Sequence, residues 1–127
     1  PYRDLAMNRV VGLVDIIYLN DSTCSECYDV MGHKQIVGGS FGAALVNETL
    51  LDISSVEGKA LVSKYSIKSV PTFVMSPEAK YYSILMEVWP GVGTQDSNGW
   101  YVFRNITQMQ SNYKDLETGN VVTFASG

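Results

Sequence analysis

Apolar residues in this chain gather into short runs separated by turn-forming residues, which predicts a sheet with helices between its strands. Residues 13–19 (LVDIIYL) form a near-continuous apolar run rich in β-branched residues, a pattern typical of a buried parallel strand. A second central strand is predicted at 50–53, and a third at 72–75, directly after Pro71. These runs predict the middle of one sheet.

Helical spacing of apolar residues recurs between and beyond these runs. Four helices are predicted, at residues 2–10, 24–37, 54–65 and 106–116. The glycine pair at 38–39 is expected to end the second helix, and Gly119 the last one. Ser54 and Glu57 form a capping-box pattern that opens the third helix. Its inward-facing residues are expected to be Val56, Ala60, Leu61 and Tyr65.

The region after residue 76 is predicted to extend the sheet. Alternation over 82–89 indicates a strand, which Gly91 and Gly93 end, and the Asn-Gly pair at 98–99 is a hairpin signal before an extra edge strand at 100–103. Strands alternating with helices and followed by a hairpin predict an α/β fold. We expect a mixed central sheet of four to five strands with helices on both faces. A length of 127 residues suggests that 1–127 is a single domain.

Composition narrows the possible partners. The net charge is −4 and the basic residues are scattered, which argues against a nucleic-acid partner. No apolar run approaches the length of a membrane span. The chain starts at Pro1 without an initiator Met or a signal-peptide pattern, so we expect a processed product or a domain excised from a longer or membrane-anchored protein.

The two cysteines, Cys24 and Cys27, are the only ones in the chain. Closing so short a loop constrains the unfolded chain by only about 2 kcal/mol, so redox chemistry or metal binding explains the pair better than a structural role. In the predicted helix, Cys24 lies at the N-terminus, where the helix favours a thiolate. Cys27, one turn further and more buried, is then placed to resolve a mixed disulfide.

Residues around Cys24 are expected to modulate its pKa: Thr23, Ser25 and Glu26. The Glu26 carboxylate repels a thiolate and raises its pKa unless water screens it, which favours a reductant or isomerase over a strong oxidant. Zinc is the rival chemistry, because CxxC is half of many zinc sites. His33 is the only histidine and is expected to face solvent from the helix, so no metal site is predicted.

A second motif lies downstream of the cysteines. Together with the CxxC pair, residues 60–74 (ALVSKYSIKSVPTFV) resemble the thioredoxin superfamily. The likeness covers about residues 13–93. It implies that Pro71 is cis and faces the CxxC, and that Val70 pairs its backbone with a bound peptide. By this resemblance the substrate-binding residues are Val70, Pro71 and Thr72.

The chain departs from thioredoxins in two ways. Its Thr-Cys-Ser-Glu-Cys differs from their Trp-Cys-Gly-Pro-Cys. The family's buried carboxylate near the second cysteine has no secure match, because Asp15 lies in the expected strand but about three residues too far from Cys24.

The resemblance implies a thiol–disulfide oxidoreductase in redox homeostasis, with Cys24 and Cys27 catalytic. Its partners are expected to be protein disulfides or dithiols and a redox partner, with no cofactor and a monomeric state. A thioredoxin-like binding module with a vestigial or transiently metal-binding CxxC is the alternative. The compartment stays open, with a lean towards an extracytoplasmic one from three N-glycosylation patterns, at Asn20, Asn47 and Asn105.

Overall fold

A computed structural model describes residues 2–4, 9–106 and 111–123 of the chain. Its main feature is a mixed five-stranded sheet with the strand order β4-β3-β6-β8-β7. Strands β3 and β4 are parallel, and the other neighbours are antiparallel. The strands are β3 (Leu13–Asn20), β4 (Ala44–Asp52), β6 (Thr72–Met75), β7 (Gly93–Gln95) and β8 (Tyr101–Phe103).

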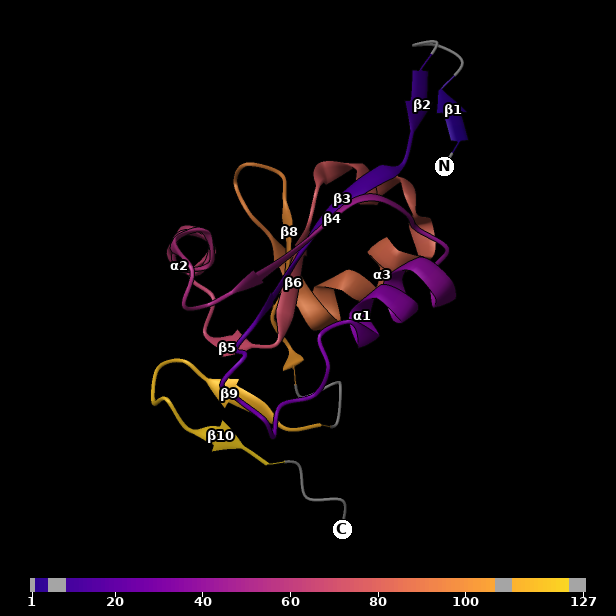
Figure 1. Cartoon of the computed structure of the whole chain (residues 1–127). Helices are drawn as coiled ribbons and strands as arrows, with labels where there is room; N and C mark the ends of the chain where they lie inside the picture. The colour runs from indigo at the N-terminus through magenta and orange to yellow at the C-terminus, as the bar shows by residue number, and fades with distance from the viewer. Residues whose placement is uncertain (1, 5–8, 107–110, 124–127) are drawn as a thin grey trace.

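The sheet separates two cores. Along β3, Ile16 and Tyr18 belong to one core while Leu19 belongs to the other, because successive side chains of a strand point to opposite faces. Helices cover both faces: α1 (Gly32–Lys34) and α3 (Ser83–Val92) lie on one face, and α2 (Val56–Tyr65) lies on the other (Figure 1). The predicted α/β class with a mixed sheet between helices is confirmed at this level.

Helix α2 is confirmed with small shifts. Its N-cap is Ser55, one residue later than predicted, and the Ser55 side chain accepts a hydrogen bond from the backbone N–H of Gly58. Leu61 and Tyr65 are buried as expected. Val56 and Ala60 are exposed, so their predicted inward orientation is wrong.

Three of the strand predictions are wrong, one in the type of element and two in the position of the strand within the sheet. Residues 82–89 form most of helix α3, after the 3-10 turn η2 (Pro77–Tyr81). Leu85 and Trp89, four residues apart, are buried there, so the sequence's helical spacing overrides its alternation. Strand β4 is at the edge of the sheet, and β8 is internal because β7 pairs outside it.

The two ends of the described chain are extended. Strands β1 (Tyr2–Asp4) and β2 (Arg9–Val11) pair antiparallel, so the helix predicted at 2–10 is wrong for these residues. A three-stranded sheet joins β5 (Ser69–Val70), β9 (Tyr113–Asp115) and β10 (Val121–Val122). The helix predicted at 106–116 is therefore wrong at 113–115, and its residues 107–110 lie outside the described part. Pairing of β9 with a strand some forty residues upstream overrides the local helical spacing.

Among the described residues, no helix is long and apolar enough to cross a membrane.

The start of α2 generates a test of packing. A Cβ on Gly58 would overlap the carbonyl oxygen of Asp52, whereas one on Gly91 in α3 meets nothing within 4 Å. We expect Gly58→Ala to lower the free energy of unfolding by about 1–3 kcal/mol through overpacking. Gly91→Ala, the matched control, gains up to about 1 kcal/mol from helix propensity. Urea unfolding measures both, and a Gly58→Ala protein as stable as Gly91→Ala would contradict the packing.

Candidate functional site

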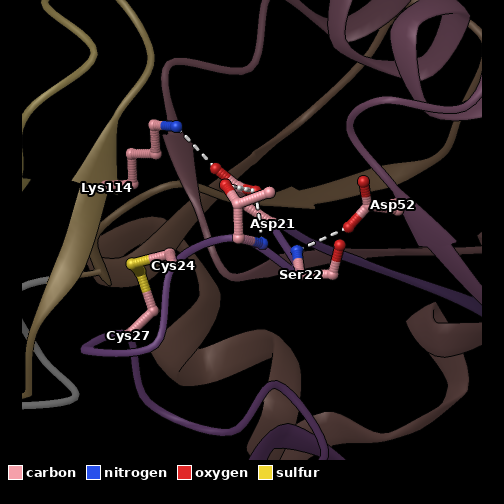
Figure 2. Close-up of a disulfide and its surroundings, with 7 residues drawn as sticks. Asp21, Ser22, Cys24, Cys27, Asp52 and Lys114 are labelled. Carbon is pink, nitrogen blue, oxygen red and sulfur yellow. Dashed lines mark hydrogen bonds and ion pairs between the residues drawn. A yellow bond between two sulfur atoms is a disulfide. The ribbon is translucent and has the colours of Figure 1, made fainter.

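The two cysteines lie in the loop after β3, at the end of the sheet where β3 meets the start of β6. Leu19 near the end of β3 pairs with Thr72, the first residue of β6. Cys24 and Cys27 form a disulfide with a Cα–Cα distance of 5.5 Å, and Figure 2 shows it near Asp21 and Ser22, which follow β3. Both cysteines are half-buried, so neither is sealed in the core.

The cysteine loop is not helical. The backbone N–H of Cys24 donates to the carbonyl of Asp21 (3.0 Å) and that of Tyr28 to the carbonyl of Asn112 (3.1 Å). Helix α1 begins only at Gly32 and continues as a π-helical turn, η1 (Gln35–Ser40). The prediction that Cys24 starts a helix is therefore wrong, because the Tyr28 N–H is bonded outside the loop. No helix end favours a thiolate at Cys24.

A buried carboxylate stands directly before the disulfide. The Asp21 side chain is 3% exposed, and Lys114 on β9 places its Nζ 2.6 Å from Oδ2 (Figure 2). The other oxygen, Oδ1, accepts hydrogen bonds from the N–H (2.9 Å) and the hydroxyl (2.6 Å) of Thr23. The sequence predicts that Thr23 modulates the pKa of Cys24, whereas its hydrogen bonds go to the carboxylate of Asp21.

These contacts decide the charge of Asp21. Burial alone would raise the pKa of this carboxyl, but the hydrogen bonds from Lys114 and Thr23 outweigh it and lower the pKa below its ordinary value. Asp21 is therefore ionised at neutral pH and forms an ion pair with Lys114.

Asp15 does not supply this carboxylate. It lies at the other end of β3, where its backbone N–H donates to Ser76, and its half-exposed carboxylate accepts a hydrogen bond from Asn47. The sequence analysis did not single out Asp21 and missed its burial. The signal available was an acidic residue directly after a buried apolar strand and three residues before Cys24.

A second carboxylate anchors the other side of the loop. The N–H of Ser22 donates to Oδ1 of Asp52 at the end of β4 (2.6 Å), as Figure 2 shows. The hydroxyl and N–H of Ser54, together with Ser22, lower the pKa of Asp52 to about 2 against the effect of burial. The start of the loop is thus fixed to β4 as well as to β9.

The segment predicted to bind substrate is buried. The Val70–Pro71 peptide bond is cis, in agreement with the family pattern. Val70, Pro71 and Thr72 are all buried, and the Thr72 hydroxyl donates to the carbonyl of Phe103 (2.6 Å). The Thr72 side chain is therefore used in a hydrogen bond within the sheet.

The backbone edge of Val70 already has a partner. Strand β5 pairs antiparallel with β9, with Ser69 opposite Asp115 and Val70 opposite Lys114. The pairing extends beyond β5, because the N–H of Leu116 donates to the carbonyl of Lys68 (2.8 Å). The chain's own strand occupies the edge that the resemblance assigns to a bound peptide.

Tyr28 joins the cysteine loop to Pro71. Its hydroxyl donates to the carbonyl oxygen of Pro71 (2.9 Å) and lies 2.6 Å from Nε2 of His33. Burial raises the pKa of the Tyr28 hydroxyl, so it stays protonated and able to donate. Because Tyr28 directly follows Cys27, the disulfide loop and the Pro71 segment are held side by side.

His33 is buried, and the prediction that it faces solvent is wrong. Only 2% of it is exposed, and its ring packs on Phe73 and Phe103 with centroid distances of 4.7 and 4.8 Å. Burial lowers the pKa of His33 from 6.5 to about 4, so the ring is neutral at pH 7. The missed signal was the apolar spacing of Val30, His33 and Val37, which are all buried.

The described residues contain no group of three or more His, Cys, Asp or Glu side chains arranged to hold a metal ion. In that part of the chain the zinc alternative has no set of ligands.

The buried His33 generates a pH prediction. In the unfolded chain His33 becomes protonated below about pH 6.5, whereas in the fold it stays neutral until about pH 4. The contribution of His33 to stability therefore falls as the pH falls through this window. From pH 7 to pH 5 the wild type should lose about 2 kcal/mol more than His33→Gln, which does not titrate. Denaturant unfolding at the two pH values measures the difference. Parallel losses in both proteins would show that His33 titrates normally in the fold.

Comparisons of the chain with protein-family models, with curated proteins and with solved structures find no match in any of the three. The site is therefore interpreted from its own geometry and from the two motifs in the sequence.

Proposed function

We propose that this protein is a thiol–disulfide oxidoreductase of the thioredoxin-like superfamily that exchanges disulfides with protein substrates through Cys24 and Cys27. One observation carries the proposal. The only two cysteines of the chain form a half-buried disulfide in a loop that the next residue, Tyr28, fastens to Pro71. A disulfide closing so short a loop adds little to stability, so its position beside the Pro71 segment favours a redox role.

The arrangement of the sheet supports the same proposal. The cysteine loop follows a strand parallel to β4, and Pro71 precedes an antiparallel strand, β6, on the other side of β3. Helix α3 lies between β6 and β8 in the chain, where the sequence pattern predicts a strand. The proposed likeness therefore covers β3 to β6 best.

The reaction is a two-electron exchange. In the dithiol form, the Cys24 thiolate attacks one sulfur of a substrate disulfide, and a mixed disulfide forms while the other substrate sulfur leaves as a thiolate. The Cys27 thiolate then attacks the Cys24 sulfur, which re-forms the Cys24–Cys27 disulfide and releases the second substrate thiolate. In these two steps, the two cysteine thiols of the protein are oxidised to a disulfide, and the substrate disulfide is reduced to two thiols. A dithiol donor returns the protein to its reduced form.

Electrostatics around Cys24 favours a reductant or isomerase over a strong oxidant. Glu26 is exposed two residues from Cys24, and no helix begins at the cysteines. A strong oxidant needs a well-stabilised thiolate in its reduced form. Neither feature stabilises that thiolate here.

A binding module with a non-catalytic disulfide is the second candidate. The observation that favours it is the burial of Val70 and Pro71 and the pairing of Val70 with Lys114. In this state the predicted docking edge is closed to a peptide.

Reduction of insulin by dithiothreitol separates the two candidates. We expect the wild type to accelerate insulin precipitation and Cys24→Ser to abolish the acceleration, because the attacking sulfur is lost. Ser63→Ala, which keeps the whole cysteine loop and changes an exposed residue of α2, serves as the control. Equal rates for the wild type and Cys24→Ser would favour the binding module.

A further inference from the structure

We propose that β9 takes the place of an extended protein substrate on Val70, and that the substrate which displaces it carries a basic side chain in place of Lys114. This inference rests on the proposed function and names its substrate class. Its starting point is the three-stranded sheet β10-β9-β5, which lies beside the cysteine loop at one end of the molecule (Figure 1).

The backbone of β9 makes the contacts that an added substrate strand would make. Lys114 lies opposite Val70, and the N–H of Leu116 donates to the carbonyl of Lys68. When a peptide adds to a sheet edge, such main-chain bonds supply affinity and the side chains supply specificity. A substrate strand and β9 therefore compete for one edge.

Few strand-pairing contacts hold β9 in place, so a substrate strand can exchange with it. Strand β9 has three residues and β5 has two, and all three β9 residues are only half-buried. Strand β10, its other neighbour, pairs through two residues, and Val122 is 37% exposed. Segments with few buried contacts open at low free energy compared with the core.

The contacts of the Lys114 side chain indicate which kind of substrate side chain the site selects. Its ammonium group pairs with the Asp21 carboxylate, which is 3% exposed. Removing Lys114 leaves that carboxylate buried without its cation, which is costly. A Lys or Arg of the substrate restores the pair, whereas an acidic residue adds repulsion. By contrast, Lys68 and Glu117, which flank β5 and β9, form a surface pair at 3.6 Å, with side chains 70% and 64% exposed.

Displacement of β9 would also release a contact next to the disulfide. Asn112, the residue before β9, accepts the N–H of Tyr28, which follows Cys27. Asp21 lies three residues before Cys24, whose N–H it accepts. A substrate strand whose basic side chain pairs with Asp21 would therefore pass the residues that flank the two cysteines.

Two disulfide peptides test the proposal, identical except for Lys or Glu on both sides of the first cysteine. Each rate, as kcat/KM, is divided by that of the same protein on hydroxyethyl disulfide, a small neutral substrate that needs no strand pairing. We expect the wild type to prefer the basic peptide by about tenfold, and Asp21→Asn to lose this preference. Lys114→Gln should raise the normalised rate on the basic peptide several-fold, and Lys59→Gln, the matched control, which removes an exposed lysine of α2, should behave as the wild type.

The outcomes separate the two proposals. If the wild type does not reduce hydroxyethyl disulfide above the level of Cys24→Ser, the proposed function fails. If it does so but shows no preference between the peptides, or if Lys114→Gln and Lys59→Gln have the same rates, the substrate inference is wrong and the proposed function stands.

Hydrogen exchange on the wild type gives a second test that needs no variant at Lys114. The probe is the basic peptide with serine in place of both cysteines, which binds without reacting. We expect it to speed exchange of the Leu116 N–H, which loses the Lys68 carbonyl, while amides of β3 stay protected. Unchanged or slower exchange at Leu116 with bound peptide would overturn the displacement of β9.

Discussion

A buried carboxylate needs a cation, and in this protein that need organises the end of the molecule that carries the disulfide. Asp21 follows a buried strand and is itself almost fully buried, and its cation, Lys114, comes from the far end of the chain. The pair therefore fixes β9 against the cysteine loop. The pairing of β9 with Val70 and its contact with Tyr28 both depend on this placement.

The cysteine loop is rigidly attached although it contains no helix. Asp52 holds it on one side, Lys114 on the other, and Tyr28 ties its far end to Pro71. Each anchor is a polar group whose partner lies on another element. Positioning of this kind keeps a disulfide loop fixed while leaving the backbone around the sulfurs free of helical hydrogen bonds, so the reactivity of Cys24 depends on neighbouring side chains.

The parts of the fold that the sequence predicts well are those set by local burial. The apolar runs at 13–19 and 72–75 become β3 and β6, and the capped segment before Tyr65 becomes α2. Some of the errors occur where a distant partner decides the outcome. Residues 113–115 form a strand because Val70 pairs with Lys114, and nothing near them in the sequence signals that contact.

The candidate site follows the same division. The pairing of Cys24 with Cys27 and the closeness of their loop to Pro71 could be predicted from motifs, because spacing and resemblance are local properties. The burial of Asp21 and His33 was missed, because the local signals at these positions do not show the remote side chains that cover them: Lys114 for the carboxylate, and Phe73 with Phe103 for the imidazole. A polar residue is read as solvent-facing until its partner is known.

The hydroxyl of Tyr28 has a single proton, and this sets the direction of a short chain of hydrogen bonds. A carbonyl oxygen only accepts, so the phenolic proton points to Pro71 and the imidazole must donate through Nε2–H. The neutral ring is thus the Nε2–H tautomer, with its lone pair on Nδ1. An acid strong enough to protonate the ring adds its proton at Nδ1 and leaves the link from His33 through Tyr28 to Pro71 unbroken. Acid therefore threatens this region by burying a charge among aromatic rings, while the connection to the proline loop survives.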